Sequence, residues 1–275
     1  ASFIRKSSDI KEVREILNSH NGNNIQIIAK IENQEGVNNI DSILQEADGI
    51  MVARGDMGVE IPIEKVPIIQ KKIIRKCNEC GKIVITATQM LDSMIRNSLP
   101  TRAEACDICN AIFDGTDAIM LSGETAAGKY PVEAVKTMAT IAKRAEETMR
   151  NRRDKINKSK NVTDAISYAT CTTAMDLEAK AILSSTASGH TARMVSKFRP
   201  DCPIVATTSN ESVRRQLALT WGVLPLMREK SANIDQVIVN SIEAAKTSNY
   251  VSKDDVVVIT AGGGETTNLI KVETV

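Results

Sequence analysis

Aromatic side chains are scarce in this sequence, and their scarcity excludes several kinds of partner. Phenylalanine, tryptophan and tyrosine make up 3% of its 275 residues, which leaves few rings on which nucleobases could stack. The formal net charge is only +1, so the chain offers no strong field to a nucleic-acid backbone or an anionic membrane. We therefore expect no nucleic acid and no membrane among its partners.

Long hydrophobic runs are also missing. No uninterrupted apolar stretch approaches the roughly 18 residues that a membrane span needs, and the first residues lack a basic segment followed by an apolar one. Six cysteines in a chain of this length are too few for a disulfide framework and are typical of a reducing compartment. These features predict a cytoplasmic protein.

The cysteines nevertheless include two C-x-x-C pairs, Cys77 with Cys80 and Cys106 with Cys109, a spacing found in zinc sites. The interval between the pairs is wider than the usual roughly 15 to 20 residues and contains a complete apolar strand. Both pairs also lie in helical patterns, where cysteine is commonly a small core residue. The core interpretation is therefore favoured over a zinc site.

Short β-rich runs alternate with amphipathic segments over the first half of the chain. Because strands that alternate with helices form parallel βα units, this pattern predicts an α/β fold. The chain opens inside a strand, so we expect further residues upstream. The predicted elements are strands at 1–4, 25–31, 49–53, 83–88 and 118–122, a helix beginning near Met90, and a long helix from Pro131 with Val132, Val135, Met138 and Ile141 on one stripe.

A charged stretch at 150–160 follows, and we expect a domain boundary there, between residues 152 and 153. The residues after this boundary, 153–275, are predicted to form a smaller α/β domain with a mainly parallel sheet. Its last two strands are expected to form a hairpin through the glycine-rich turn 261–267. The predicted elements are a helix at 162–177 and strands at 181–184, 204–207, 223–226, 256–260 and 269–272.

Reactive side chains gather at the predicted strand ends, where parallel βα barrels carry their active sites. The period of two places Lys30 and Glu32 on one face of their strand. The next strand runs into Arg54, Gly55 and Asp56, where glycine frees the backbone beside a carboxylate. Glu32 and Asp56 would then flank one point, and two hard carboxylates suit Mg²⁺ or Mn²⁺. An ordinary salt bridge between Lys30 and Glu32 is the alternative.

Hydroxyl groups and another carboxylate follow the next two strands. Thr86 and Thr88 are predicted on one face at a strand end, where hydroxyls can bind an anion or relay a proton, although β-propensity alone would also place threonine there. Ser122 and Glu124 lie at the rim. Together with Arg54 they are interpreted as a supporting layer that orients the lysine or the metal, with a solvated loop as the alternative.

Five segments together resemble successive motifs of the pyruvate kinase family, in the same order. This resemblance covers essentially all 275 residues and implies a partial (β/α)8 TIM barrel over 1–152, without its N-terminal strands and lid domain, followed by a regulatory α/β domain over 153–275. It also implies transfer of the phosphoryl group of phosphoenolpyruvate to ADP, giving pyruvate and ATP in glycolysis. The five segments are 29–33 (AKIEN), 51–56 (MVARGD), 87–91 (ATQML), 100–104 (PTRAE) and 120–125 (MLSGET).

The resemblance also implies roles for individual residues. Glu32 and Asp56 would hold the divalent metal, and Lys30 would face the phosphoryl group. The N–H groups of Gly55 and Asp56 and the Thr88 hydroxyl would receive the substrate carboxylate, and Thr88 would lie on the path of the proton. Potassium is implied as a second cofactor with ligands outside these residues, and the complete protein is expected to be a homotetramer.

A second candidate site follows a predicted strand of the smaller domain. The chain passes through a hydroxyl-rich turn into a helix beginning near Thr191, a junction that suits a phosphate group. Thr186, Ser188, Gly189 and Thr191 resemble the loop that holds a sugar-phosphate effector in many pyruvate kinases, which implies a sugar-phosphate or nucleotide effector. His190 stands where others carry arginine or lysine. An ordinary capped helix start is the alternative.

Two other functions are compatible with the residues. A metal-dependent oxo-acid lyase of the same barrel family also uses a carboxylate pair around Mg²⁺ to stabilise an enolate, although it would not be expected to carry the second α/β domain. The chain could instead act as a noncatalytic fragment that retains only effector binding and subunit contacts.

Overall fold

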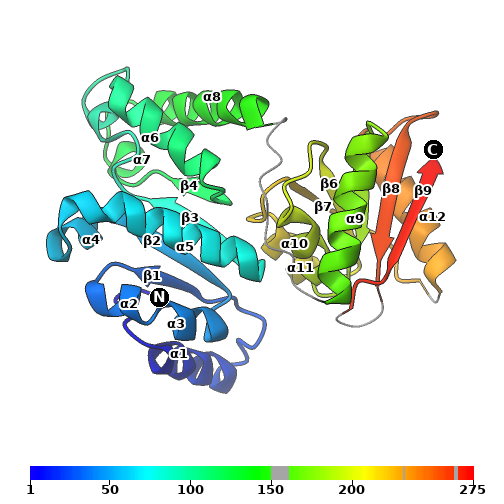
Figure 1. Cartoon of the computed structure of the whole chain (residues 1–275), viewed down its shortest axis with the longest axis horizontal. Coiled ribbons are helices and arrows are strands. Elements are labelled where there is room, and N and C mark those ends of the chain that lie inside the picture. Colours follow the sequence, from blue (N-terminus) through cyan, green and yellow to red (C-terminus); the bar gives the residue numbers. More distant parts are fainter. Residues whose placement is uncertain (150–160, 232, 263–265) are drawn as a thin grey trace. The chain divides into compact units, whose positions relative to one another are not determined.

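The computed structural model describes residues 1–149, 161–231, 233–262 and 266–275. The chain divides into two compact units, Ala1–Arg153 and Asp154–Val275, which are described separately below (Figure 1). The predicted domain boundary between residues 152 and 153 falls within the charged stretch 150–160. All of these residues lie outside the described part of the chain. No helix in the described ranges is long and apolar enough to span a membrane.

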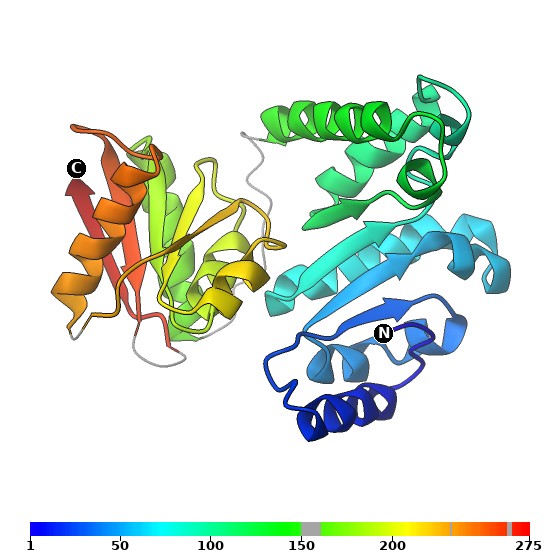
Figure 2. The ribbon, with the colours of Figure 1, turned by 180° about the vertical axis from the view of Figure 1, so that it is seen from behind.

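The first unit is built around four parallel strands that lie side by side in chain order, β1-β2-β3-β4 (Figures 1 and 2). Each strand is followed by at least one helix, so the predicted βα repeat is confirmed. Its elements are α1 (Ser7–Ser19), β1 (Ile28–Ile31), α2 (Gln34–Asn38), α3 (Ile40–Glu46), β2 (Gly49–Ala53), α4 (Arg54–Glu60), the 3₁₀ helix η1 (Ile63–Lys65), α5 (Val66–Cys80), β3 (Ile83–Ala87), the 3₁₀ helix η2 (Asp92–Ile95), α6 (Arg102–Phe113), β4 (Ala118–Met120), α7 (Gly123–Ala126) and α8 (Pro131–Met149).

Burial along β1 explains which way its side chains face. Ala29 and Ile31 are fully buried in a core shared with α1, α3 and α5, whereas Ile28 and Lys30 are half-buried on the opposite face. This alternation is the period of two that the sequence predicts. The lysine side chain therefore lies on the face of the sheet opposite these helices. When such a sheet closes into a barrel, this is the face that lines the interior.

Some predicted elements of this unit are wrong or shorter than expected. Residues 1–4 do not form a strand, although Lys30 N donates to Ala1 O at 2.9 Å. No α-helix begins near Met90; a 3₁₀ turn begins at Asp92 instead. In α8 the buried residues are Ala134, Met138 and Ala145. Of the other predicted stripe residues, Ile141 is partly buried, whereas Val132 and Val135 are exposed. A helix packs its small residues inward where a neighbouring helix approaches closely, here α6.

The second unit is a three-layer α/β sandwich with strand order β7-β6-β5-β8-β9. The first four strands are parallel, and β9 pairs antiparallel with β8. Its elements are α9 (Val162–Asp176), β5 (Ala181–Ser185), α10 (His190–Ser196), β6 (Ile204–Thr208), α11 (Glu211–Leu217), β7 (Val223–Met227), α12 (Ile234–Thr247), β8 (Val256–Ala261) and β9 (Leu269–Thr274).

Two cores lie on the two faces of this sheet. Ile182 packs with residues of α9, α10 and α11, and its neighbour Leu183 packs on the other face with residues of α12. The mainly parallel sheet and the β8–β9 hairpin are as predicted. Residues 263–265 of the expected glycine-rich turn lie outside the described part of the chain.

A buried ion pair joins α9 to the end of α10. Lys197 Nζ lies 3.1 and 3.0 Å from the two carboxylate oxygens of Asp164, and both side chains are only 3% exposed. Each charge is therefore removed from water and depends on the other for compensation.

We expect Lys197→Met to lower the free energy of unfolding by about 3–5 kcal/mol, because it leaves the Asp164 carboxylate buried without its cation. Urea denaturation followed by circular dichroism measures this loss. The matched control is the double variant Lys197→Met/Asp164→Leu, which removes both charges and should recover most of the stability. A loss below about 1 kcal/mol in the single variant would contradict this account.

The single tryptophan of the sequence lies in this unit. The Arg199 guanidinium stacks on the Trp221 ring, 4.9 Å from its centroid, a cation–π contact. Ser196 Oγ also donates to the Trp221 carbonyl at 2.6 Å. These contacts connect the end of α10 to the segment that leads into β7.

Candidate active site

The strand register of the first unit brings the predicted site residues to one edge of the sheet. Ile31 pairs with Val52, and Ala53 pairs with Ala87. The residues that follow these strands, beginning with Glu32, Arg54 and Thr88, therefore emerge at neighbouring positions. This edge is the carboxyl end of parallel strands, where α/β folds place their ligands.

An ammonium between two carboxylates forms the charged part of the site. Lys30 Nζ lies 2.6 Å from Glu32 Oε2 and 3.0 Å from Asp56 Oδ2. The Glu32 side chain is 2% exposed and Asp56 is 56% exposed, so the group runs from the protein interior to solvent. Glu32 Oε1 accepts a hydrogen bond from Phe3 N at 2.6 Å. The structure thus brings together the three charged residues that the sequence places at the strand ends.

The contacts shift the pKa values of two of these groups in opposite directions. The pKa of Lys30 is raised above its ordinary 10.5, chiefly by the close contact with Glu32. The pKa of Asp56 is lowered below its ordinary 3.8, chiefly by the hydrogen bond from Lys30. Their attraction is lost only when the pH rises through the pKa of Lys30 or falls through that of Asp56. Both groups stay charged across the neutral range.

Thr88 adopts a conformation that the sequence does not reveal. Strand β3 ends at Ala87, and the backbone then turns left-handed, with φ of 71° at Thr88 and 55° at Gln89. Such a conformation costs about 1–3 kcal/mol at a residue other than glycine. The Thr88 hydroxyl donates to Ala87 O at 2.6 Å and accepts from Gly55 N at 2.7 Å. Thr86, expected beside Thr88, is instead fully buried and bonds Thr116.

The Gly55–Thr88 hydrogen bond affects what this corner can bind. The N–H group of Gly55 is expected to receive a substrate carboxylate, yet here it already donates to the Thr88 hydroxyl. A carboxylate bound at this N–H group would replace the Thr88 hydroxyl as its acceptor. A side chain at Gly55 would also crowd the corner, since an added Cβ would lie 3.3 Å from Thr88 Oγ1.

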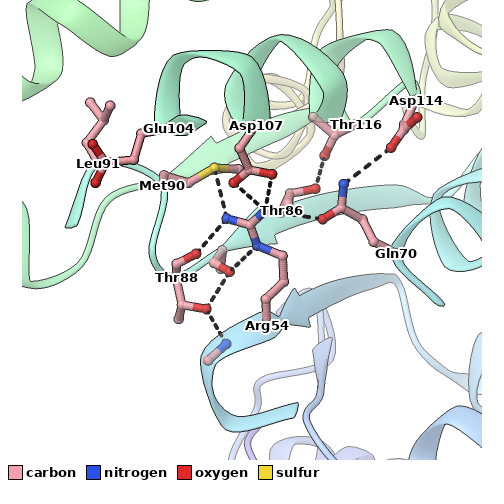
Figure 3. A network of polar contacts seen from close by, with 12 residues as sticks. Arg54, Gln70, Thr86, Thr88, Met90, Leu91, Glu104, Asp107, Asp114 and Thr116 are labelled. Carbon is pink, nitrogen blue, oxygen red and sulfur yellow. Dashed lines mark hydrogen bonds and ion pairs between the residues drawn. The ribbon is translucent and has the colours of Figure 1, made fainter. Parts of the chain in front are cut away.

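Arg54 lies between the turn at Thr88 and Asp107 of α6 and is bonded to both (Figure 3). Its side chain is 10% exposed. Nη2 donates to Thr88 O at 2.7 Å, and Nη1 donates to both carboxylate oxygens of Asp107 at 2.7 and 2.6 Å. Gln70 Oε1 accepts a longer bond from Nη1 at 3.3 Å. Arg54 therefore has a supporting position, in contact with the Thr88 backbone and not with Lys30.

Glu124 ties the loop after β3 to the end of β4. The side chain is 2% exposed, with Oε1 accepting from Leu91 N at 3.1 Å and Oε2 from Ser122 N at 2.7 Å. Glu104 of α6 similarly accepts two bonds from Ser93, from its N at 2.7 Å and its Oγ at 2.6 Å. Ser122 contributes its backbone here, and neither Ser122 nor Glu124 contacts Lys30 in any described bond.

The two units match models of two domains of one protein family. The pyruvate kinase barrel-domain model matches residues 1–135, and the pyruvate kinase alpha/beta-domain model matches residues 164–273.

The chain belongs to the pyruvate kinase family.

Several curated pyruvate kinases align with the whole chain or nearly so. That of Clostridium acetobutylicum is 58% identical and that of Geobacillus stearothermophilus 56% identical, each over 100% of this chain. That of Clostridium perfringens is 54% identical over 99% of it. The chain spans 60%, 48% and 60% of the length of these three relatives. The first unit is thus part of a pyruvate kinase barrel, and the second is the family's α/β domain.

The carboxylates of this pyruvate kinase barrel fit a hard divalent cation. Glu32 Oε2 is buried and accepts no hydrogen bond of ordinary geometry, although the Lys30 ammonium lies beside it. Asp56 faces the same ammonium. No group of three or more aspartate, glutamate, histidine or cysteine side chains is arranged around one point in the described residues. Two carboxylates with room for water and substrate oxygens suit Mg²⁺ or Mn²⁺.

The predicted effector residues of the pyruvate kinase α/β domain lie together where β5 leads into α10. Thr186 Oγ1 accepts from Gly189 N at 2.9 Å, and Thr191 Oγ1 accepts from Thr267 Oγ1 at 3.0 Å. Gly189 has a φ of 83°, which favours glycine. His190 N donates weakly to Ser188 Oγ at 3.4 Å. Ser188 is exposed, whereas Thr186 and Thr191 are buried.

Two contributors to the pyruvate kinase barrel site were missed by sequence reasoning. Phe3 supplies a backbone N–H to Glu32, and no side-chain pattern marks such a contact. Asp107 lies between Cys106 and Cys109, and that cysteine spacing does not indicate a partner for its carboxylate. A signal existed, because the capping box of Thr101 and Glu104 fixes the start of α6 and puts Asp107 one turn after Glu104 on the same face.

Proposed function

We propose that the protein carrying this chain transfers the phosphoryl group of phosphoenolpyruvate to ADP, giving pyruvate and ATP in glycolysis. The observation that carries this proposal is the Lys30 ammonium held between Glu32 and Asp56, beside the Gly55–Thr88 corner. Phosphoryl transfer needs mainly fixed positive charge and positioning, which this group supplies.

The chain's own residues act on the two ends of the substrate. The bond between the enol oxygen and phosphorus breaks as a β-phosphate oxygen of ADP bonds to the phosphorus. The Lys30 ammonium stabilises the negative charge of the phosphoryl group during transfer. The N–H groups of Gly55 and Asp56 and the Thr88 hydroxyl hold the substrate carboxylate. The enolate left behind takes a proton at carbon, by way of a water held at Thr88.

The cofactors follow from the same chemistry. Glu32 and Asp56 would hold Mg²⁺ or Mn²⁺, which supplies charge neutralisation to the phosphate and carboxylate oxygens when bound. Potassium is proposed as the second cofactor on family grounds. Arg54, Ser122 and Glu124 support the site from behind, as their contacts with the strand-end loops indicate.

We further propose residues 1–152 as the C-terminal portion of the catalytic barrel and 153–275 as a regulatory domain of a cytoplasmic homotetramer. The alignment of the chain with 60% and 48% of the length of longer pyruvate kinases supports a partial barrel. The loop of Thr186, Ser188, Gly189, His190 and Thr191 would bind the phosphate of a sugar-phosphate or nucleotide effector, supported by its glycine turn and clustered hydroxyls.

The test of the main proposal is pyruvate formation from phosphoenolpyruvate by the complete polypeptide that carries these residues. Pyruvate and ATP should appear in equal amounts and only when ADP and Mg²⁺ are present. Pyruvate formed without ADP would contradict the assignment and favour a phosphatase. Cleavage of an oxo acid, with phosphoenolpyruvate left unchanged, would contradict it and favour a lyase. The 275-residue chain assayed in parallel tells whether these residues suffice.

We expect Ser188→Ala to weaken binding of a phosphorylated effector about tenfold, because one hydrogen bond to a charged oxygen is lost. Calorimetry on the 275-residue chain with glucose 6-phosphate and with adenosine monophosphate measures this and identifies the effector class. Ser212→Ala on α11, another exposed serine, is the matched control and should bind as the unaltered chain does. Equal affinity in the two variants would remove Ser188 from the site.

A further inference from the structure

Asp107 lies on α6, one layer behind the strand-end residues. Both of its carboxylate oxygens accept hydrogen bonds from Arg54 Nη1, at 2.7 and 2.6 Å. Arg54 is almost entirely buried, so its charge depends on this carboxylate for compensation. Asp107 itself makes no described bond to Lys30, Glu32 or Asp56.

The other side of the Arg54 guanidinium faces the backbone turn after β3 (Figure 3). Nη2 donates to Thr88 O at 2.7 Å, and Nε makes a longer contact with Ala87 O at 3.4 Å. These are the carbonyls at which the chain leaves the strand and enters the left-handed conformation. A β-branched residue adopts that conformation only where surrounding contacts impose it.

The same turn is also tied to Arg54 through the neighbouring residue. Gly55 N donates to the Thr88 hydroxyl at 2.7 Å. Arg54 and Gly55 therefore hold Thr88 at two points, one on its carbonyl and one on its side chain.

We propose that Asp107 is a positioning residue for phosphoryl transfer, acting only through Arg54 to fix the strained Thr88 turn. This inference rests on the proposed function and adds a residue to it. Asp107 makes no described bond to Lys30, Asp56 or Thr88 itself. Its carboxylate orients the Arg54 guanidinium, and the guanidinium holds the Thr88 carbonyl and so fixes the residue that carries the hydroxyl. A displacement of a reacting group by about 1 Å can lower turnover about a hundredfold.

The test is a double-mutant cycle in the complete polypeptide. Asp107→Asn keeps the size of the side chain but removes its charge and one acceptor, and it should lower kcat about tenfold or more. The KM for ADP should stay unchanged, because no nucleotide contact is assigned to this corner. In a Thr88→Val background, Asp107→Asn should lower kcat by less than about twofold, because the group that it positions is gone.

The matched control is Asp117→Asn. Asp117 also accepts a backbone bond from β3, from Val84 N at 2.9 Å, but at the opposite end of the strand from Thr88. It should keep kcat within about twofold, because it alters a side-chain contact of the same strand away from the Thr88 turn. If Asp107→Asn fails to fold, Arg54→Lys replaces it, since a lysine keeps the charge but cannot make both sets of bonds.

The outcomes separate the two proposals. If the unaltered polypeptide makes no pyruvate, the proposed function fails first. If it is active and Thr88→Val is impaired, but Asp107→Asn lowers kcat equally in both backgrounds, Asp107 acts through general loosening and the positioning role is overturned. A kcat unchanged by Asp107→Asn overturns it as well.

Discussion

Lys30→Met in the complete polypeptide should lower kcat about a thousandfold while the KM for phosphoenolpyruvate changes by less than about threefold. The loss corresponds to about 4 kcal/mol of transition-state stabilisation. It is expected to be this large because the ammonium is fixed in place by two carboxylates before substrate arrives, so its charge needs no reorganisation. The proposed site for the substrate carboxylate is elsewhere, at Gly55, Asp56 and Thr88, so binding should be spared.

Steady-state kinetics at saturating metal measures this effect. Lys71→Met is the matched control, since Lys71 is an exposed lysine of the same unit that pairs with Asp114 and lies outside the site. It should retain full turnover. Normal turnover by Lys30→Met would remove the lysine from the chemistry, and an equal loss in both variants would point to destabilisation.

Glu32→Gln should raise the concentration of Mg²⁺ or Mn²⁺ needed for half-maximal activity by about tenfold to a hundredfold. Glutamine keeps an oxygen that can accept the Phe3 N–H bond, so the local fold has no reason to change. It loses the charge with which Glu32 would bind a cation. The pKa of Lys30, which Glu32 raises, should also move back toward 10.5.

Mn²⁺ binding measured by electron paramagnetic resonance without substrate gives a second readout, independent of turnover. The matched control is Glu35→Gln, three residues later on α2, where the side chain is exposed and outside the site. Its metal affinity should equal that of the unaltered protein. An unchanged affinity in Glu32→Gln would show that the ion is held by other groups.

The inner strands β2 and β3 could be predicted closely because their residues are mainly apolar and both of their faces are largely buried, whereas the predicted strand 1–4 does not form and β1 is shorter than predicted. Residues 49–53 form a strand with the predicted bounds, and both faces of β3 are buried. Since parallel strands end at one edge, the meeting of Lys30, Glu32 and Asp56 could also be predicted. The period of two sets which way a side chain points, and the register then brings these residues together.

The Thr88 corner could not be predicted in the same way. The period of two continues through Thr88 in the sequence, but the strand ends at Ala87, and the backbone that follows is bonded to the side chains of Arg54 and Glu124. These contacts join residues more than thirty positions apart. Local propensity does not register them, and for the same reason the role of Asp107 emerges only from the folded arrangement.

The position of Trp221 makes the two units separable by optical measurement. Its indole is the only one in the sequence, so tryptophan emission comes solely from the α/β unit, where the Arg199 guanidinium stacks on the ring. Far-ultraviolet signal, in contrast, comes from both units. A change of emission on addition of phosphoenolpyruvate and metal, which are proposed to bind the barrel, would therefore report an effect on the α/β unit, and its persistence in Ser188→Ala would exclude binding at the phosphate loop as the cause.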